Sequence, residues 1–199
     1  IVSNGSSPVS YHTVHHEERD SAQLHLVLGA DGLPYGHKDR YAFYLVNAIL
    51  GSSMSSRLFQ EIREKRGLAY NIGSYLQSYR EAGLFVIDGS CAPESFPLVL
   101  DLIRRESQRM REEGPSPAEL ERAKVQFRVG LSLAAESTSF RMQHLAASEL
   151  YWGRVLSFDE ILAGVEQVTA EEVHRLAKLA LTVDSQALVA IGPFEEQET

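Results

Sequence analysis

The side chains of this chain best placed for chemistry lie around Gly67: Arg63, Lys65 and Arg66 before it, and Tyr70 after it. All four are hydrogen-bond donors. The run from Gly51 to Tyr79 predicts a glycine-marked turn, a short amphipathic helix, a break at the glycine and then a strand, which brings the donors to one junction. A structural interpretation also fits, because cations complement the negative end of a helix and a glycine there supplies a left-handed cap. The pattern alone leaves both open.

A second candidate site is the run of histidines and glutamates from His12 to Glu18. The inverse zinc motif H-x-x-E-H requires Glu at the position that His15 occupies here. In an extended segment, His12 and His16 share a face but lie about 13 Å apart, too far for ligands that each approach zinc to about 2 Å. We therefore predict a surface run without a native zinc site. An independent metal-binding module using His12, His15 and His16 is the alternative.

Other catalytic signatures are missing from the sequence. The run from Gly51 to Ser55 breaks the nucleophile-elbow pattern G-x-S-x-G at its final glycine, and no phosphate-binding glycine loop is present. His25, His144 and His174 lie in strand or helix patterns and are predicted to be structural. Cys91 is the single cysteine, which excludes an intrachain disulfide; its strand alternation predicts a buried thiol. Alone, the chain carries no complete catalytic apparatus.

Composition narrows the possible partners. The net charge of −8, from 19 basic and 27 acidic residues, argues against nucleic acid, which requires a concentrated basic face. The densest basic stretch, Arg104–Glu113, interleaves arginines with glutamates and predicts a solvated helix face. No apolar run approaches the ~20 residues that span a bilayer, so we expect no membrane span and a soluble protein. The start at Ile1, without a signal-peptide pattern, indicates a fragment boundary, and the compartment stays open between bacterial-type cytoplasm and periplasm.

The elements that must position these residues follow from hydrophobic spacing and capping signals. Extended structure is predicted from Tyr11 to His16, and the alternation of Leu24, Leu26 and Leu28 predicts a strand. The further predicted elements are a strand over Ala22–Gly29, a helix capped by Asp39 and ending at Leu50, a short helix from Ser55 or Ser56, a hairpin of Tyr70–Tyr79 and Leu84–Cys91, and a last strand over Ala187–Ile191.

Helical patterns fill most of the chain after the hairpin. Three S/T-x-x-E capping boxes, at Ser116, Ser157 and Thr169, mark helix starts. Strands separated by helices, without a repeat or a linker, predict an α+β fold with an antiparallel or mixed sheet and helices on one face. We expect a loose segment over residues 1–10, one domain over 11–194 and an acidic tail over 195–199.

Three runs carry a family resemblance: Asn47–Gly51, Met54–Phe59 and Glu61–Tyr70. They resemble the C-terminal half of pitrilysin/insulinase-type (inverzincin) zinc peptidases, most closely the processing-peptidase branch. The resemblance continues through the hairpin and the later helices, and covers roughly Ala22 to Pro193. It implies the α+β half-domain of those enzymes.

The resemblance also implies a division of labour between two homologous halves that face each other across a chamber. The N-terminal half carries H-x-x-E-H and the zinc, so zinc is expected in the complete enzyme and none on this chain. The C-terminal half contributes an arginine and a tyrosine, which map onto Arg63 and Tyr70. Arg63 would hydrogen-bond a substrate carbonyl, and Tyr70 would donate to the oxyanion formed when water attacks the scissile bond. The substrate would be an extended oligopeptide or an unfolded presequence-like segment.

The chain departs from the complete family pattern because it lacks the zinc motif. It therefore belongs to a longer polypeptide or works with a separate zinc-bearing subunit; a homodimer is a further possible assembly. Family members without the catalytic set persist as structural subunits, so a non-catalytic assembly subunit is the alternative function. Retention of both Arg63 and Tyr70 favours a contribution to catalysis.

Overall fold

The computed structural model describes residues 13–182 and 187–193, and it confirms the predicted α+β class. A five-stranded mixed sheet has the strand order β1-β5-β2-β4-β3. Strands β1 and β5 pair in parallel, and the other neighbours are antiparallel. The strands are β1 (Val14–Glu18), β2 (Leu24–Gly32), β3 (Ala69–Ser78), β4 (Gly83–Cys91) and β5 (Ala187–Gly192). The predicted loose segment 1–10 and acidic tail 195–199 lie outside the described residues.

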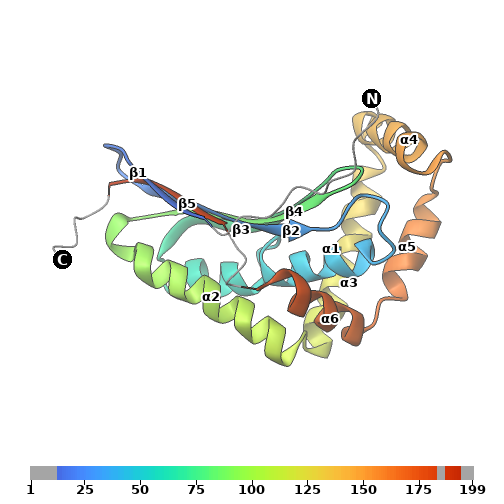
Figure 1. The fold of residues 1–199 in the computed structure, drawn as a ribbon. Helices are drawn as coiled ribbons and strands as arrows, with labels where there is room; N and C mark the ends of the chain where they lie inside the picture. Colours follow the sequence, from blue (N-terminus) through green and yellow to red (C-terminus); the bar gives the residue numbers. More distant parts are fainter. Residues whose placement is uncertain (1–12, 183–186, 194–199) are drawn as a thin grey trace.

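Helices cover one face of this sheet (Figure 1). Helices α1, α2 and α6 lie beneath the strands, and α4 and α5 stand at one end of the sheet. The helices are α1 (Arg40–Leu50), η1 (Phe59–Glu64), η2 (Pro93–Ser95), α2 (Phe96–Glu113), α3 (Pro117–Ala134), α4 (Thr138–Trp152), α5 (Phe158–Glu166) and α6 (Ala170–Ala180). None of the described helices is long and apolar enough to cross a bilayer.

Local signals placed the starts of three helices correctly. Ser116, Ser157 and Thr169 each form the predicted capping box, in which the cap side chain and the glutamate three residues later satisfy backbone N–H groups reciprocally. The predicted cap of α1 is wrong. Asp39 makes no cap hydrogen bond, because its carboxylate binds Arg175 of α6 at 2.8 Å instead.

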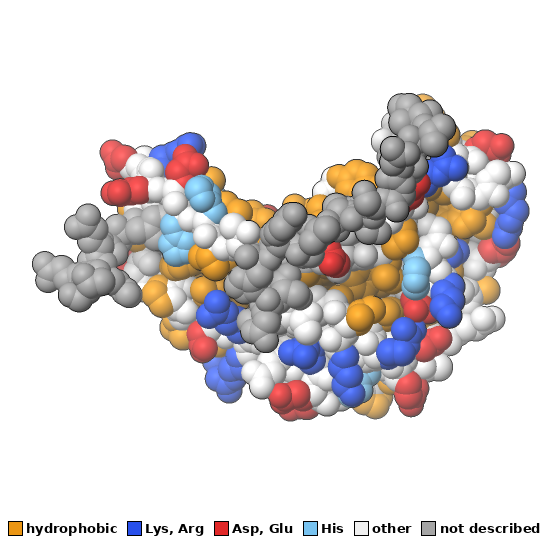
Figure 2. Space-filling view, viewed as in Figure 1, with side chains coloured by type: hydrophobic (Ala, Val, Ile, Leu, Met, Phe, Trp, Pro, Cys, Tyr) orange, Lys and Arg blue, Asp and Glu red, His pale blue; other side chains and the backbone are white. Residues whose placement is uncertain are grey.

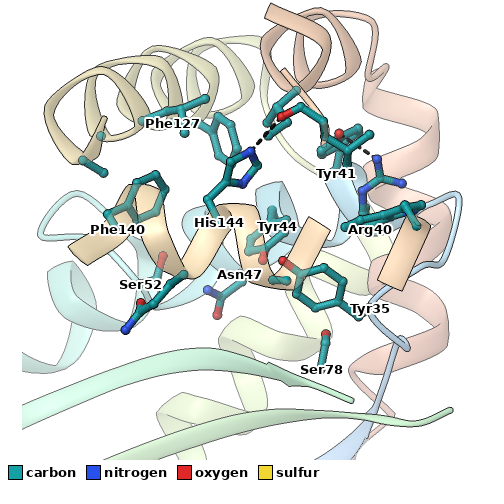
Figure 3. A pocket seen from close by; sticks show the side chains of 18 residues that line it. Tyr35, Arg40, Tyr41, Tyr44, Asn47, Ser52, Ser78, Phe127, Phe140 and His144 are labelled. Carbon is teal, nitrogen blue, oxygen red and sulfur yellow. Dashed lines mark hydrogen bonds between the residues drawn. The ribbon is translucent and has the colours of Figure 1, made fainter. Parts of the chain in front are cut away.

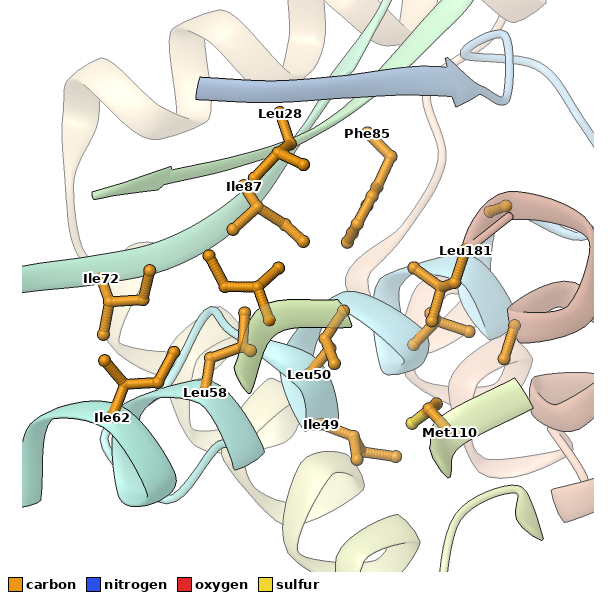
Figure 4. Packing of buried hydrophobic residues seen from close by; sticks show 14 of the residues in the cluster. Leu28, Ile49, Leu50, Leu58, Ile62, Ile72, Phe85, Ile87, Met110 and Leu181 are labelled. Atoms are coloured by element: carbon orange, nitrogen blue, oxygen red, sulfur yellow. The ribbon is translucent and has the colours of Figure 1, made fainter. Parts of the chain in front are cut away.

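The core lies between the sheet and the helices that cover it (Figure 4). Leu24, Leu26 and Leu28 of β2 are buried on one face, as their alternation predicts. Ile87 of β4 and Ile62 of η1 are fully buried in the same cluster. Burial of a side chain of this size contributes about 1.5–3 kcal/mol, so Ile62 fixes η1 firmly to the domain.

One prediction for α2 fails in part. Arg104, Arg105 and Arg109 are exposed, as expected for a solvated face. Glu106, however, is buried, and its carboxylate accepts hydrogen bonds from Arg109 at 3.1 and 3.2 Å. Arg109 supplies the charge partner that a buried carboxylate requires.

A second buried charge pair joins Arg57, just before η1, to Glu119 in the first turn of α3. Arg57, only 7% exposed, donates from Nε and Nη2 to the two carboxylate oxygens of Glu119 at 2.7 and 2.9 Å. Its Nη2 also donates to the Gly114 carbonyl at 2.9 Å. This bidentate pair is among the stronger ionic contacts available to a protein. It fixes the beginning of the segment that carries Arg63.

The same pair makes stability depend on pH. Burial alone would raise the pKa of Glu119, but the hydrogen bonds from Arg57 and Ser116 outweigh it and lower the pKa to about 2. An unfolded glutamate has a pKa of about 4.3. A depressed pKa in the folded state contributes stability above the unfolded value and loses it as the pH falls through the folded value.

We expect Glu119→Gln to lower the free energy of unfolding at pH 7 by about 3–5 kcal/mol, because it leaves the Arg57 guanidinium buried without its charge partner. The measurement is urea unfolding followed by circular dichroism. Glu121→Gln, two residues along on the exposed side of α3, is the matched control and should change stability by less than about 0.5 kcal/mol. Equal effects of the two substitutions would contradict the role of the pair.

The difference in stability between the native chain and Glu119→Gln should shrink as the pH falls from about 4.5 to about 2, because in that window Glu119 is protonated in the unfolded chain while it stays ionised in the folded one. The contribution lost is on the order of 3 kcal/mol. Unfolding curves at half-unit pH intervals measure it. A difference that stays constant down to pH 2 would show that Glu119 is not held ionised by its partners.

Candidate functional site

Arg63 lies on η1, a π-helix whose wider turn is closed by a hydrogen bond from the Lys65 N–H to the Gln60 carbonyl at 3.0 Å. π-Helical turns are rare and occur frequently at functional sites. Gly67 ends the helix with φ +63°, which confirms the predicted left-handed cap, and its N–H donates to the Arg63 carbonyl at 2.9 Å. The junction is therefore a defined backbone structure.

Two of the three cations at this junction are engaged by one glutamate. Glu61 forms ion pairs with Lys65 and with Arg66, the latter at 2.6 Å. Hydrogen bonds from Lys65 and then Arg66 lower the pKa of Glu61 to about 2. Arg66 also donates to the Glu61 carbonyl at 2.6 Å. The structural interpretation therefore fits Lys65 and Arg66.

Arg63 is different from its two basic neighbours. It is exposed and makes no hydrogen bond or ion pair with any residue that the structure describes. Its guanidinium lies over the Phe59 ring, with Cζ 4.9 Å from the centroid. A cation–π contact steadies the side chain while leaving the N–H donors available, so Arg63 can bind an acceptor from outside.

Tyr70 sits at a β-bulge where β3 begins. Ala69 pairs with Cys91 and Asn71 with Ser90, which leaves Tyr70 as the extra residue of β3. Its side chain is 76% exposed, and no hydrogen bond to the phenol is formed within the described chain. Bulges re-aim side chains and are over-represented beside active sites.

This bulge differs from the prediction, in which Tyr70 is the first residue of a regular strand. Tyr70 and Asn71 are both exposed, which breaks the alternation of buried and exposed residues, but Tyr70, Asn71 and Ile72 alternate regularly as apolar, polar and apolar in the sequence, so no local signal marks the bulge. The structure thus places both predicted site residues on the surface, on either side of Gly67.

Tyr75 lies further along β3 than Tyr70, on the face of the sheet opposite the helices, and is 46% exposed. Figure 2 shows the outline of the molecule hollowed above the sheet, between the end of β1 and α4. Apolar residues that alternate with the core residues of the other strands are also exposed there: Val27, Leu84 and Val189. This face offers a partly apolar concave surface.

The remaining histidines do not form a site within the described chain. His15 and His16 are consecutive in β1 and so project from opposite faces of the strand, and the His16 ring packs edge-on against Phe96 at 6.4 Å. No group of three or more His, Cys, Asp and Glu side chains in residues 13–182 and 187–193 could hold a metal ion. His12 lies outside those residues.

Other side chains considered from the sequence have structural surroundings. The rings of His144 and His174 hydrogen-bond the carbonyls of Leu156 at 2.7 Å and Arg111 at 2.8 Å, as expected for structural histidines. Cys91 is buried as predicted; burial, with Glu94 nearby, raises the pKa of its thiol to about 11. A thiol with so high a pKa is not a nucleophile at neutral pH.

Comparison with known proteins connects this geometry to a family. A family model described as the peptidase M16 inactive domain matches residues 5–127. A protein of Streptomyces coelicolor named as an uncharacterized zinc protease is 37% identical over 180 residues, covering 90% of this chain and 39% of its own length. A protein of Bacillus subtilis with the same description is 36% identical over 176 residues, covering 88% of this chain and 43% of its own length.

Solved structures show the same fold. The peptidase M16 inactive domain from Pseudomonas fluorescens has a TM-score of 0.88 at 28% identity, covering all of this chain and 48% of that one. A protease from Helicobacter pylori has a TM-score of 0.80 at 18% identity, over 96% of this chain and 48% of that one, which supports the fold alone. This chain spans about two fifths of the length of the curated relatives. It belongs to the peptidase M16 inactive-domain family.

Proposed function

We propose that this chain is the substrate-positioning half of a zinc endopeptidase, and that it donates Arg63 and Tyr70 to a site whose zinc lies on a homologous half. The observation that carries the proposal is the state of these two side chains. Both are exposed and lack hydrogen-bond partners within the described chain, although the backbone is fixed by the buried Ile62 before Arg63 and by the glycine cap at Gly67 between the two. Donors held without internal partners are available to an external substrate.

The relatives support the rest of the arrangement. Those that match most of this chain are named zinc proteases, and more than half of their length lies outside the match. The described residues of this chain offer no ligand set for zinc. We therefore assign the metal to the other half, where, when bound, it would supply activated water for hydrolysis.

Arg63 would position the substrate. Its guanidinium presents N–H donors on a side chain steadied by Phe59, and a peptide carbonyl is a suitable acceptor. A contact to a carbonyl remote from the scissile bond is made equally in the ground and transition states. Its loss should therefore raise KM more than it lowers kcat.

Tyr70 would act on the transition state. Its phenol can donate a hydrogen bond to the oxyanion that forms at the scissile carbonyl, and the bulge holds the side chain clear of the β3–β4 ladder. Losing one oxyanion donor typically costs about 3 kcal/mol of barrier, which is roughly a hundredfold in rate. This contact exists only as charge develops, so its loss should lower kcat.

The surroundings of the site support a proposal for the substrate class. The open face of the sheet carries half-exposed apolar and aromatic residues rather than a closed specificity pocket. We propose that extended oligopeptides or unfolded presequence-like segments lie along it and are recognised mainly through main-chain hydrogen bonds. Selection would then depend on length and unfoldedness more than on sequence.

We expect Tyr70→Phe, in the chain assembled with its zinc-bearing half, to lower kcat for a quenched fluorescent peptide about a hundredfold with KM nearly unchanged. Tyr75→Phe removes a hydroxyl from the same strand and is the matched control, with turnover within about twofold of the parent. Both sites are exposed, so stability should change by less than about 0.5 kcal/mol. Full turnover by Tyr70→Phe would remove the oxyanion role and favour a non-catalytic assembly subunit of the same fold.

A further inference from the structure

A cavity of about 690 Å³ lies among α1, α3 and α4, at a place that the proposed function does not use (Figure 3). Ser78, at the opposite end of β3 from Tyr70, belongs to its lining. The volume falls in the range of small-molecule sites, about 300–1,000 Å³. The inner face of α4 forms one wall, through Phe140, His144 and Ala147.

Aromatic rings dominate the walls. Six of the described lining side chains carry a benzene or indole ring: Tyr35, Tyr41, Tyr44, Phe127, Phe140 and Trp152. Tyr35 is held by stacking on Tyr151 at 4.1 Å and by contact with Trp152 at 4.9 Å between centroids. Phe127, Phe140 and Leu131 make one end apolar, and this end suits an aliphatic or aromatic group.

The other end of the cavity carries a cation that has no acidic partner among the described residues. Arg40 is the single charged residue among the described lining side chains, which include no carboxylate. Its guanidinium lies over the rings of Tyr41 and Trp152, at 4.1 and 5.0 Å, and its Nη2 donates to the Tyr41 hydroxyl at 2.7 Å. These contacts fix the orientation of the guanidinium and leave further N–H donors for an anion.

A buried amide adds a second polar feature to the cavity. Asn47 is 8% exposed and lines the cavity; its Oδ1 accepts from Ser74 Oγ at 2.7 Å. Its Nδ2 has no hydrogen-bond partner among the described residues. Nδ2 is not among the fully buried atoms that lack a partner, so it retains accessible surface and can donate to a bound acceptor.

The hydroxyls of Tyr35 and Tyr44 also favour a ligand that accepts hydrogen bonds. Burial raises the pKa of Tyr35 and of Tyr44, despite the opposing charge of Arg40 near each. Both phenols therefore stay protonated at neutral pH and can donate. A guanidinium, an amide and two phenols thus face a space to which the described part of the chain contributes no carboxylate.

We propose that this cavity is a binding site for an amphipathic carboxylate: a small molecule with one anionic head group at Arg40 and an aliphatic or aromatic body against Phe127 and Phe140. A cationic ligand is disfavoured by Arg40, and a fully apolar one would leave the Arg40 and Asn47 donors without an acceptor. The site is separate from Arg63 and Tyr70, so it stands or falls independently of the peptidase function.

The single tryptophan of the chain, Trp152, lies in the cavity wall and reports occupancy directly. The test titrates the 199-residue chain with decanoate, decanol and decylammonium, which share one tail, and follows Trp152 fluorescence. Decanoate should bind saturably and at least about tenfold more tightly than decanol, because hydrogen bonds to a charged group are the stronger kind. Decylammonium should bind more weakly than decanol. Equal affinities for all three, or no saturable change with decanoate, would overturn the proposal.

Two substitutions locate the site. Arg40→Gln should remove the preference for decanoate over decanol, whereas Arg80→Gln, in the exposed β3–β4 turn, should leave it unchanged. Gly130→Leu projects a side chain from a cavity-lining position of α3 where an added Cβ meets no atom within 4 Å. It replaces a helical glycine, so folding should be retained, and it should weaken decanoate binding about tenfold or more by filling the space. Undiminished binding by the folded Gly130→Leu chain would place the ligand elsewhere.

Discussion

The ion pair between Arg57 and Glu119 is the contact on which the arrangement of the candidate site depends. It joins residues 62 positions apart, and both groups are largely removed from water. A buried pair of this kind contributes little net stability compared with apolar packing, but removal of one partner is severely destabilising. The main effect of the pair is therefore on geometry, because it fixes where η1 begins relative to α2 and α3.

Because the start of η1 is fixed, the backbone around Gly67 has little conformational freedom. Ile62 binds the middle of η1 to the core, and Gly67 turns the chain into β3 with a left-handed residue. Glu61 holds Lys65 and Arg66, which keeps these two cations from competing for an anionic or polar substrate group. Arg63 and Tyr70 are thus presented by rigid elements while their polar groups have no partner among residues 13–182 and 187–193. Preorganised donors of this kind are what electrostatic stabilisation of a transition state requires.

Much of the fold could be predicted from the sequence because the signals involved are local. The capping boxes at Ser116, Ser157 and Thr169 and the alternation of β2 act over a few residues, and the structure confirms each. The cap assigned to Asp39 was wrong for the opposite reason. A short acidic side chain before a helix also suits a partner from another element, here Arg175, which no local pattern reveals.

The candidate site also combines features that the sequence predicts with features that depend on contacts between distant elements. Family resemblance predicts Arg63 and Tyr70 as site residues, and their role stays a prediction. The bulge at Tyr70 comes from a register shift between two strands, which no local pattern reveals. The Arg57–Glu119 pair and the aromatic cavity are likewise products of contacts between elements distant in sequence. Arg40, Asn47 and Trp152 share no spacing that would have marked them as neighbours.

The central claim is that this chain completes a catalytic site that its zinc-bearing half cannot complete alone. The most direct measurement is hydrolysis of a quenched fluorescent peptide by this chain, by an H-x-x-E-H half from the same parent protein or operon, and by their mixture, with zinc present and association verified by co-elution. The account predicts strong hydrolysis only in the mixture. Equal hydrolysis by the zinc-bearing half with and without the associated chain, or hydrolysis by this chain alone, would contradict it.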